Sequence, residues 1–264
     1  MEFIHLIILG LIQGLTEFLP VSSSAHLILL PALAGWKDQG IVYDIAVHAG
    51  SLGAVVLYFR KDIQAMIVGW LASFSATNKD KDFLLWYLLM ATIPVGLAGL
   101  LLHDFVATTL RSPQVIATAS IVFGLVLWWA DKYGARSRSQ GELSWRDALI
   151  IGIAQALAII PGTSRSGITI TAGLMLGLDR QSASRFSFLL AIPVIILATG
   201  YETYKLSSGQ MDFDWVSLIT VSAVAFFSAW LSIHYFLKLL NRTGMLPYVI
   251  YRVLLGLLLF AIYY

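Results

Sequence analysis

Long runs of apolar residues dominate the chain and are separated by short polar connections. Six of these runs hold close to the ~20 residues that a helix needs to span the ~30 Å hydrocarbon core of a bilayer. They are Ile41–Phe59, Phe83–His103, Val115–Asp131, Phe186–Tyr204, Trp215–Phe236 and Leu246–Tyr264. A shorter run, Ile63–Phe74, suits an interfacial helix. The pattern predicts an all-α integral membrane protein with six transmembrane helices.

Two further apolar runs are interrupted by a proline. Phe3–Leu19 stops at Pro20 and Ala148–Ile160 stops at Pro161, and a Ser/Thr/Gly cluster and a second short apolar run follow each break. Hydrophobic segments broken at corresponding places of two halves are typical of re-entrant or discontinuous helices around a site at the membrane midplane. We therefore expect two re-entrant helix-loop-helix pairs in addition to the six spans.

The two broken segments also resemble one another. Gly10-Leu11-Ile12-Gln13 matches Gly152-Ile153-Ala154-Gln155, and Pro20-Val21-Ser22-Ser23 matches Pro161-Gly162-Thr163-Ser164 with one residue deleted between the anchors. The chain is thus predicted to be a single membrane domain, 1–264, with an internal repeat of approximately 1–133 and 146–264 joined by a cytoplasmic loop, 134–145. Three spans separate the copies, so the second begins on the opposite side of the membrane and the repeat is inverted.

The distribution of Lys and Arg gives an orientation. The connections 60–82, 132–147, 178–185 and 237–245 hold twelve of the seventeen, whereas the opposite connections hold Lys37, Arg111 and Lys205. Because cytoplasmic loops are enriched in Lys and Arg, the first set is assigned to the cytoplasm. Both termini are then outside, the first broken pair enters from outside, and the second enters from the cytoplasm.

Composition supports a membrane protein and excludes other classes. The chain is 58% hydrophobic and 12% charged, about half the ~25% charge of a soluble domain. A formal net charge of +2 is too small to indicate a nucleic-acid partner. The absence of cysteine excludes disulfides and thiolate metal sites.

The stretch from Gln13 to His26, QGLTEFLPVSSSAH, places several polar groups inside an apolar setting. An ionisable group at membrane depth costs at least ~2.5–3.5 kcal/mol and is a functional-site hypothesis by default. Gln13 and Glu17 share one face of a helix and could hold a divalent cation, Mg²⁺ or Ca²⁺, or orient a water. Ser22 to Ser24 suit the cap of a following helix, which leaves Glu17, Ser23 and His26 as the candidates for chemistry.

The second break, PGTSRSGIT, has the composition of a phosphate cradle. Glycines allow a tight turn, hydroxyls donate, a helix N-terminus attracts anions, and Arg165 offers a bidentate fork. The predicted phosphate contacts are Gly162, Thr163, Ser164, Ser166, Gly167 and Thr169, with Ser24 from the first loop.

Brought together, the two loops divide the work of phosphoryl transfer between them. Arg165 would hold phosphate charge while Glu17, Ser23 and His26 act on it; the attacking group stays open between Ser23, His26 and a water activated by Glu17. Asp44 and His48 lie one helical turn apart near the outer end of the first span and either line the cavity or sit at the interface. A transporter or flippase with the same midplane phosphate site is the alternative.

The two loops together resemble the signature motifs of the undecaprenyl-diphosphate phosphatases of the BacA family. The likeness covers essentially the whole chain, including FSFLLAIP at Phe186–Pro193 and the pair Tyr251-Arg252. The family pattern (E/Q)xxxE is filled by Gln13 and Glu17, PxSS(S/T)xH by Ser23, Ser24 and His26, and PGxSRSG with its essential arginine by Pro161 to Gly167. Where other members carry a second carboxylate, this chain has Gln13, which weakens its standing as an anionic metal ligand.

The resemblance implies hydrolysis of undecaprenyl diphosphate to the monophosphate carrier for cell-wall synthesis, and bacitracin resistance. It implies two inverted repeats with re-entrant pairs in the bacterial inner membrane and a site open to the outer face. The expected partners are the polyprenyl diphosphate and bilayer lipids. A homodimer stays open, because small residues such as Gly96, Ala98 and Gly99 suit helix contacts either within or between chains.

Overall fold

The computed structural model describes residues 3–36, 40–74, 82–206 and 214–263 of a chain that is almost entirely helical. Six helices are long and apolar enough to cross a membrane: α3 (Ile41–Tyr58), α5 (Leu84–Phe105), α6 (Pro113–Tyr133), α9 (Arg180–Leu206), α10 (Trp215–Thr243) and α11 (Leu246–Tyr263). The predicted all-α membrane protein with six spans is therefore confirmed. Lys37, Lys79, Lys81 and Tyr264, used in the sequence predictions, lie outside the described residues.

Two of these helices are longer than their apolar runs predicted. α9 begins at Arg180 rather than Phe186, and α10 continues to Thr243 rather than ending at Phe236. Hydrophobicity marks only the part of a helix that suits hydrocarbon, whereas backbone hydrogen bonding continues into the polar connection until a breaker is reached. For α10 that breaker is Gly244, whose φ of 61° ends the helix.

Each broken segment forms a hairpin of two shorter helices. The first hairpin is α1 (Phe3–Phe18) and α2 (Ser23–Ala34); the second is α7 (Trp145–Ala156), the 3₁₀ turn η3 (Leu157–Ile159) and α8 (Arg165–Met175). Three further elements complete the order: α4 (Arg60–Ser73), the π-helical turn η1 (Val106–Leu110) and the 3₁₀ turn η2 (Gln140–Glu142). α4 covers the predicted interfacial helix and begins three residues earlier.

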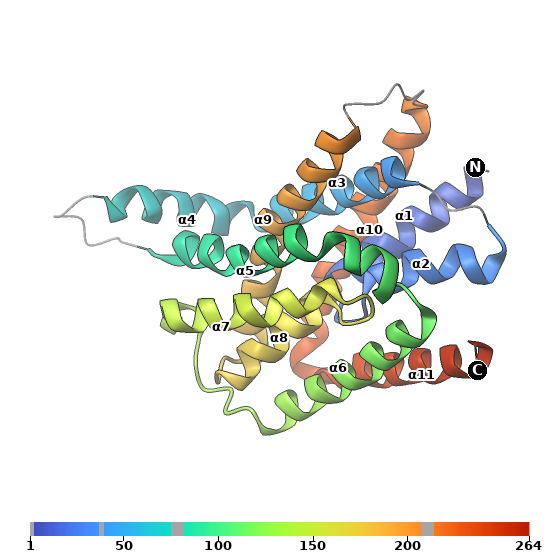
Figure 1. Cartoon of the computed structure of the whole chain (residues 1–264). Coiled ribbons are helices and arrows are strands. Elements are labelled where there is room, and N and C mark those ends of the chain that lie inside the picture. The colour runs from blue at the N-terminus through green and yellow to red at the C-terminus, as the bar shows by residue number, and fades with distance from the viewer. Residues whose placement is uncertain (1–2, 37–39, 75–81, 207–213, 264) are drawn as a thin grey trace.

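The hairpins approach the centre of the molecule from opposite sides. Figure 1 shows both termini on one side with α1 and α2, while α7 and α8 lie toward the other side. α1 packs on α10 and α3, α7 packs on α5, and α11 packs on α6. The turns of both hairpins come together in the middle, where Ser166 Oγ of the second donates to the Leu19 carbonyl of the first (2.9 Å).

Glycines set the closest of these helix contacts. A Cβ added at Gly10 of α1 would lie 2.8 Å from the Val221 carbonyl of α10, and one at Gly152 of α7 would lie 2.6 Å from the Ala91 carbonyl of α5. These two glycines begin the matched segments of the proposed repeat. Each allows its hairpin to pack closely on a long helix of the other half. Each half of the chain thus packs its hairpin on the other half, and the inverted repeat stays a prediction.

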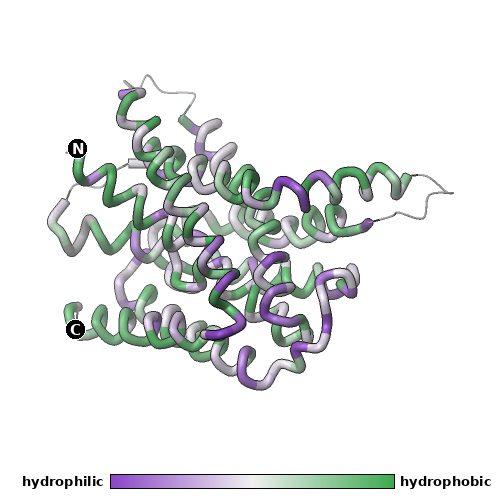
Figure 2. The backbone as a smooth tube through the Cα atoms, turned by 180° about the vertical axis from the view of Figure 1, so that it is seen from behind, coloured by the Kyte–Doolittle hydropathy of each residue, from purple (hydrophilic) through white to green (hydrophobic). Residues whose placement is uncertain are grey.

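The polar connections lie apart from the apolar exterior. Figure 2 shows hydrophobic residues along most helices and hydrophilic ones gathered largely on the side away from the termini. There Arg180 binds both oxygens of Asp131 (2.5 and 2.9 Å), and Arg138 binds Asp147 and the Leu176 carbonyl (2.8 Å). Burial alone would raise the pKa of Asp147, but the hydrogen bonds from Arg138 and Ser144 outweigh it and hold that pKa below its ordinary value.

Candidate functional site

The site is built around the carboxylate of Glu17, near the end of α1. Gln13 and Glu17 lie on the buried face of this helix, one turn apart, as the spacing predicted. The Gln13 side-chain amide donates to Glu17 Oε2 at 3.0 Å. Gln13 is completely buried and Glu17 is 8% exposed, so the carboxylate needs partners for its charge.

Three other helices supply those partners. Ser23 Oγ, at the start of α2, donates to Glu17 Oε2 at 2.7 Å. An Arg165 Nη, from α8 of the second hairpin, donates to Glu17 Oε1 at 2.8 Å, and the other Arg165 Nη donates to the Ser187 carbonyl of α9 at 3.2 Å. His48 Nε2 of α3 lies 3.8 Å from Glu17 Oε2. The predicted meeting of the two loops thus occurs as an ion pair between Glu17 and Arg165.

His48 borders the site with its side chain, whereas Asp44 contributes its backbone carbonyl. His48 faces Glu17, which favours the prediction that it lines the site over the interface alternative. The His48 ring is fixed by a 2.7 Å hydrogen bond between its Nδ1 and the Asp44 carbonyl. Because a carbonyl only accepts, Nδ1 carries the proton, so Nε2 is left as the nitrogen that points toward Glu17. Asp44 thereby supports the site through its backbone.

Most hydroxyl groups of the second hairpin turn already form hydrogen bonds with other groups of the protein. Ser164 Oγ accepts from Gly167 N (3.1 Å) and caps α8, Ser166 Oγ donates to the first hairpin, and Thr169 Oγ1 binds the Arg165 carbonyl and Ser187 Oγ (2.7 Å). These hydroxyls are buried. Their direct contact with phosphate stays a prediction, and Arg165 is the group of this turn that borders the site.

The remaining predicted members of that turn serve the backbone. Gly162 adopts a φ of 93°, which a side chain disfavours. Its carbonyl, and that of Thr163, accept hydrogen bonds from Arg252 at 2.9 and 2.8 Å. Thr163 Oγ1 is buried and finds no hydrogen-bond partner within the described part of the chain, and its predicted contact with phosphate stays a prediction.

His26 and Ser24 have hydrogen-bond partners other than Glu17. His26 Nδ1 binds the Ser22 carbonyl (2.7 Å) and His26 Nε2 binds the Tyr251 hydroxyl (2.5 Å). Ser24 is exposed, and its hydroxyl lies 3.3 Å from that of Ser22. The two candidates therefore flank the carboxylate rather than touch it.

Sequence reasoning gave no role to several residues that the fold brings to the site. Ser187 holds Arg165 and Thr169, Tyr251 holds His26, and Arg252 holds the hairpin turns. In the sequence, Arg252 stands beside Tyr251 in the last span as a cation that needs a carboxylate or carbonyl partner. The carbonyls that Arg252 binds could not be found from sequence, because any residue supplies a carbonyl.

Few side chains among the described residues could bind a metal ion. The described residues hold no group of three or more His, Cys, Asp or Glu side chains that could bind an ion. Glu17 and Gln13 nevertheless remain a possible pair, because Gln13 Oε1 is buried and has no hydrogen-bond partner among the described residues. One carboxylate and one amide oxygen, completed by substrate phosphates and waters, is a ligand set that suits Mg²⁺.

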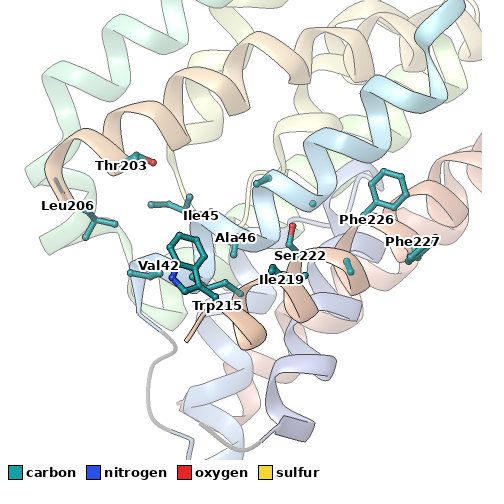
Figure 3. A pocket seen from close by; sticks show the side chains of 14 residues that line it. Val42, Ile45, Ala46, Thr203, Leu206, Trp215, Ile219, Ser222, Phe226 and Phe227 are labelled. Atoms are coloured by element: carbon teal, nitrogen blue, oxygen red, sulfur yellow. The ribbon is translucent and has the colours of Figure 1, made fainter. Parts of the chain in front are cut away.

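A large apolar pocket lies away from this cluster. A cavity of about 870 Å³ opens between α3, α9 and α10 (Figure 3). Its walls include Ile45 and Ala46 of α3 and Ile219 and Phe226 of α10, and none of the predicted site residues lines it. The polar cluster, not this cavity, is therefore the candidate active site.

Known proteins match the chain from end to end. Residues 6–258 match the family described as bacitracin resistance protein BacA, and both hairpin turns lie inside this match. The chain belongs to this family. It is 53% identical to the undecaprenyl-diphosphatase 2 of Stutzerimonas stutzeri over 100% of this chain and 99% of that protein. It is 54% identical to the undecaprenyl-diphosphatase of Teredinibacter turnerae, covering 98% and 99%, and 53% identical to that of Nitrosococcus oceani, covering 100% of both.

Proposed function

We propose that this BacA-family chain is a multi-pass membrane diphosphatase that hydrolyses undecaprenyl diphosphate to undecaprenyl phosphate and inorganic phosphate. Relatives named for this activity match it along its whole length, and the family is named for bacitracin resistance. The observation that carries the proposal at atomic level is the contact of Ser23 and Arg165 with one buried carboxylate, Glu17.

Binding of the diphosphate would begin with an exchange of partners. Arg165 is held by Glu17 in the free protein, and its planar fork suits a phosphate at least as well as a carboxylate. When the terminal phosphate takes Arg165, Glu17 Oε1 is freed for the divalent cation proposed below, while Oε2 keeps its hydrogen bond from Ser23 and can accept the Ser23 proton.

Ser23 is the nucleophile of the proposed first step. Its Oγ attacks the terminal phosphorus, Glu17 accepts the Oγ proton, and the bridging P–O bond breaks to release undecaprenyl phosphate. Water then attacks the phosphoserine, the P–Oγ bond breaks, inorganic phosphate leaves, and Ser23 regains a proton. The 2.7 Å hydrogen bond from Ser23 to Glu17 supports this choice over attack by His26.

His26 is assigned to the second step. Its Nδ1 is committed to the Ser22 carbonyl, so the proton of the attacking water goes to Nε2, which first gives up its hydrogen bond from the Tyr251 hydroxyl. A divalent cation is proposed beside this machinery, with Glu17 and Gln13 Oε1 as its protein ligands. Such an ion would neutralise charge on the diphosphate oxygens.

Phosphate release by purified variants tests the proposal. Protein in detergent, given a short-chain polyprenyl diphosphate with Mg²⁺ or Ca²⁺, is expected to release inorganic phosphate. Glu17→Gln removes the base and should lower the rate at least about a hundredfold, and Arg165→Ala should lower it about a thousandfold. Thr16→Val is the control, because Thr16 adjoins Glu17 but its hydroxyl binds only the Ile12 carbonyl of its own helix. Near-normal release by either site variant would contradict the mechanism.

The nucleophile can be identified separately. Substrate labelled with ³²P in its terminal phosphate, quenched within one turnover, should leave an acid-stable label on the wild-type protein and none on Ser23→Ala. An acid-labile label would place the phosphate on His26 instead. No label at all, with full turnover, would favour direct attack by water.

The transporter alternative gains no support from the names of these relatives. Lipid phosphate binding without phosphate release would be its signature in the same assay.

We further propose that the protein resides in the bacterial inner membrane with the site open to the outer face. The distribution of Lys and Arg supports this orientation, and a homodimer remains a prediction.

A further inference from the structure

An apolar groove lies between α3, α9 and α10, and the proposed reaction does not use it. It is the cavity of about 870 Å³ that Figure 3 shows from close by. All of its lining residues except Thr203 and Ser222 are apolar, and none of them carries a charge. Its volume lies within the range of about 300–1,000 Å³ of pockets that hold small ligands. The groove therefore suits a hydrocarbon chain and offers no partner to a phosphate.

The floor of the groove is the crossing of α3 and α10. A Cβ added at Gly50 of α3 would lie 2.1 Å from the Ser222 carbonyl of α10, so glycine is what lets the two helices approach so closely. Beside this crossing, Ala49 of α3 and Ala223 of α10 are exposed and line the groove. Their short side chains leave the space open, and a large side chain at either position would fill it.

One wall of the groove adjoins the candidate active site. Ile45 of α3 lines the groove, whereas His48 of the same helix lies 3.8 Å from Glu17 Oε2. Residues three apart are neighbours on the surface of a helix, so the groove begins beside the site. α9 also serves both places, because it contributes Ser187 to the site and its last turn to the groove. A molecule whose head is held at the site can thus lay its tail along the groove.

The groove also opens toward hydrocarbon. Trp215, Ile219 and Phe227 of its α10 wall are largely exposed, on a helix long and apolar enough to cross the membrane. A chain can therefore enter from the bilayer while its charged head stays at the polar cluster. Acyl chains of bilayer lipids meet the same surface, but a diphosphate head adds contacts with Arg165 that hold its own chain next to Ile45. These contacts favour the substrate tail as the occupant.

We propose that the apolar groove binds the isoprene units next to the diphosphate of the substrate. The proposal rests on the proposed function, which places a polyprenyl diphosphate head at Glu17 and Arg165. The remaining units stay in the bilayer. Because apolar contacts stabilise the complex in proportion to the hydrocarbon area that they bury, the groove favours a long-chain substrate over one too short to fill it.

Filling the groove tests this assignment. In bilayer nanodiscs, Ala223→Trp should lower kcat/KM for undecaprenyl diphosphate about tenfold, but should change that for dimethylallyl diphosphate, whose tail is a single isoprene unit, less than twofold. Ala198→Trp is the matched control, since Ala198 is also exposed but lines a different apolar pocket between α5 and α9. Equal losses for both substrates at an unchanged Tm, no loss for either, or a selective loss in Ala198→Trp would overturn the proposal.

Photo-crosslinking of the wild-type protein separates the groove from the reaction. A polyprenyl diphosphate with a diazirine in the isoprene units nearest its head should label α3 and α10 at groove residues, and excess undecaprenyl diphosphate should prevent this labelling. Labelling elsewhere, or labelling that a diazirine phospholipid reproduces and undecaprenyl diphosphate does not displace, would show a surface for bilayer lipids and refute the proposal. Groove labelling without phosphate release would refute the proposed function alone, and phosphate release without groove labelling would refute the groove alone.

Discussion

At the scale of single residues, the site is defined by buried polar groups that satisfy each other. Glu17 receives hydrogen bonds from Gln13, Ser23 and Arg165. A buried charge without such partners costs several kcal/mol, so the cluster can exist only when both hairpins are in place. The same contacts that stabilise the fold therefore assemble the chemistry.

Arg252 illustrates the same dependence with a different kind of partner. Its guanidinium donates to carbonyls of α6 and of both hairpin turns, Ser120 and Thr163 among them. The Pro20, Gly162 and Thr163 carbonyls lie in the turns, where no helical N–H pairs with them, whereas the Ser120 carbonyl lies inside α6. One side chain thus satisfies several buried acceptors that the breaks at Pro20 and Pro161 leave open.

Replacement of Arg252 by Met should be among the most destabilising changes in the chain. It keeps the volume but leaves buried carbonyls unpaired, for which we expect a loss of about 3 kcal/mol or more. The measurement is the apparent Tm in detergent. Arg242→Met, at an exposed Arg near the end of α10, should leave Tm nearly unchanged; equal effects of both variants would contradict the role given to Arg252.

At the scale of elements, the two hairpin turns lead into their second helices in the same way. Ser22 and Ser164 adopt φ values of 74° and 70° immediately before α2 and α8, and each places its hydroxyl near that of the serine two positions on. This pairing requires no deletion, because Gln13 and Gln155 have the same offset of 142 positions. The sequence alignment, which matched Pro20 to Pro161 and Ser23 to Ser164, was one residue out of register.

The register matters for function. Aligned by the turns, Ser23 corresponds to Arg165 and Glu17 to Ile159. The nucleophile candidate and the phosphate clamp therefore occupy equivalent first positions of α2 and α8. The second hairpin has Ile159 in the place of Glu17, so the carboxylate of the site comes from the first hairpin alone.

The second hairpin is anchored at its base by Asp147, and this anchor should depend on pH. The pKa of Asp147 is lowered in the folded protein, so its stabilisation is present above its ordinary pKa near 3.8 and is lost as pH falls through the lowered value. Asp147→Asn should lower Tm at neutral pH and flatten the loss of Tm on acidification. An unchanged acid profile in the variant would contradict this.

At the scale of the whole molecule, the opposite approach of the two hairpins decides where the site lies. Figure 1 places α1 and α2 on the side of the termini and α7 and α8 toward the other. Only the turns meet, so a carboxylate from one side and an arginine from the other form a buried ion pair. An inverted repeat produces this arrangement directly.

Cysteine labelling can establish the orientation, because the native chain has no cysteine. Gln114 and Ala135 are exposed and lie at opposite ends of α6. In intact cells an impermeant maleimide should label Gln114→Cys but reach Ala135→Cys only after permeabilisation. The reverse pattern would invert the proposed orientation, and labelling of both from one side would contradict a spanning α6.

The sequence by itself determined the parts of this protein that depend on local pattern. Apolar length gave the six spans, prolines followed by serines gave the two hairpins, and costly polar groups gave Gln13, Glu17, Ser23 and Arg165 as members of one site. Tertiary structure decided what depends on distance: that Ser23 binds Glu17 while His26 turns to Tyr251, and that Arg252 ties the turns together. The physical reason is that hydrophobic period is written along the chain, whereas hydrogen-bond partners, many of them backbone carbonyls, exist only once the hairpins have met.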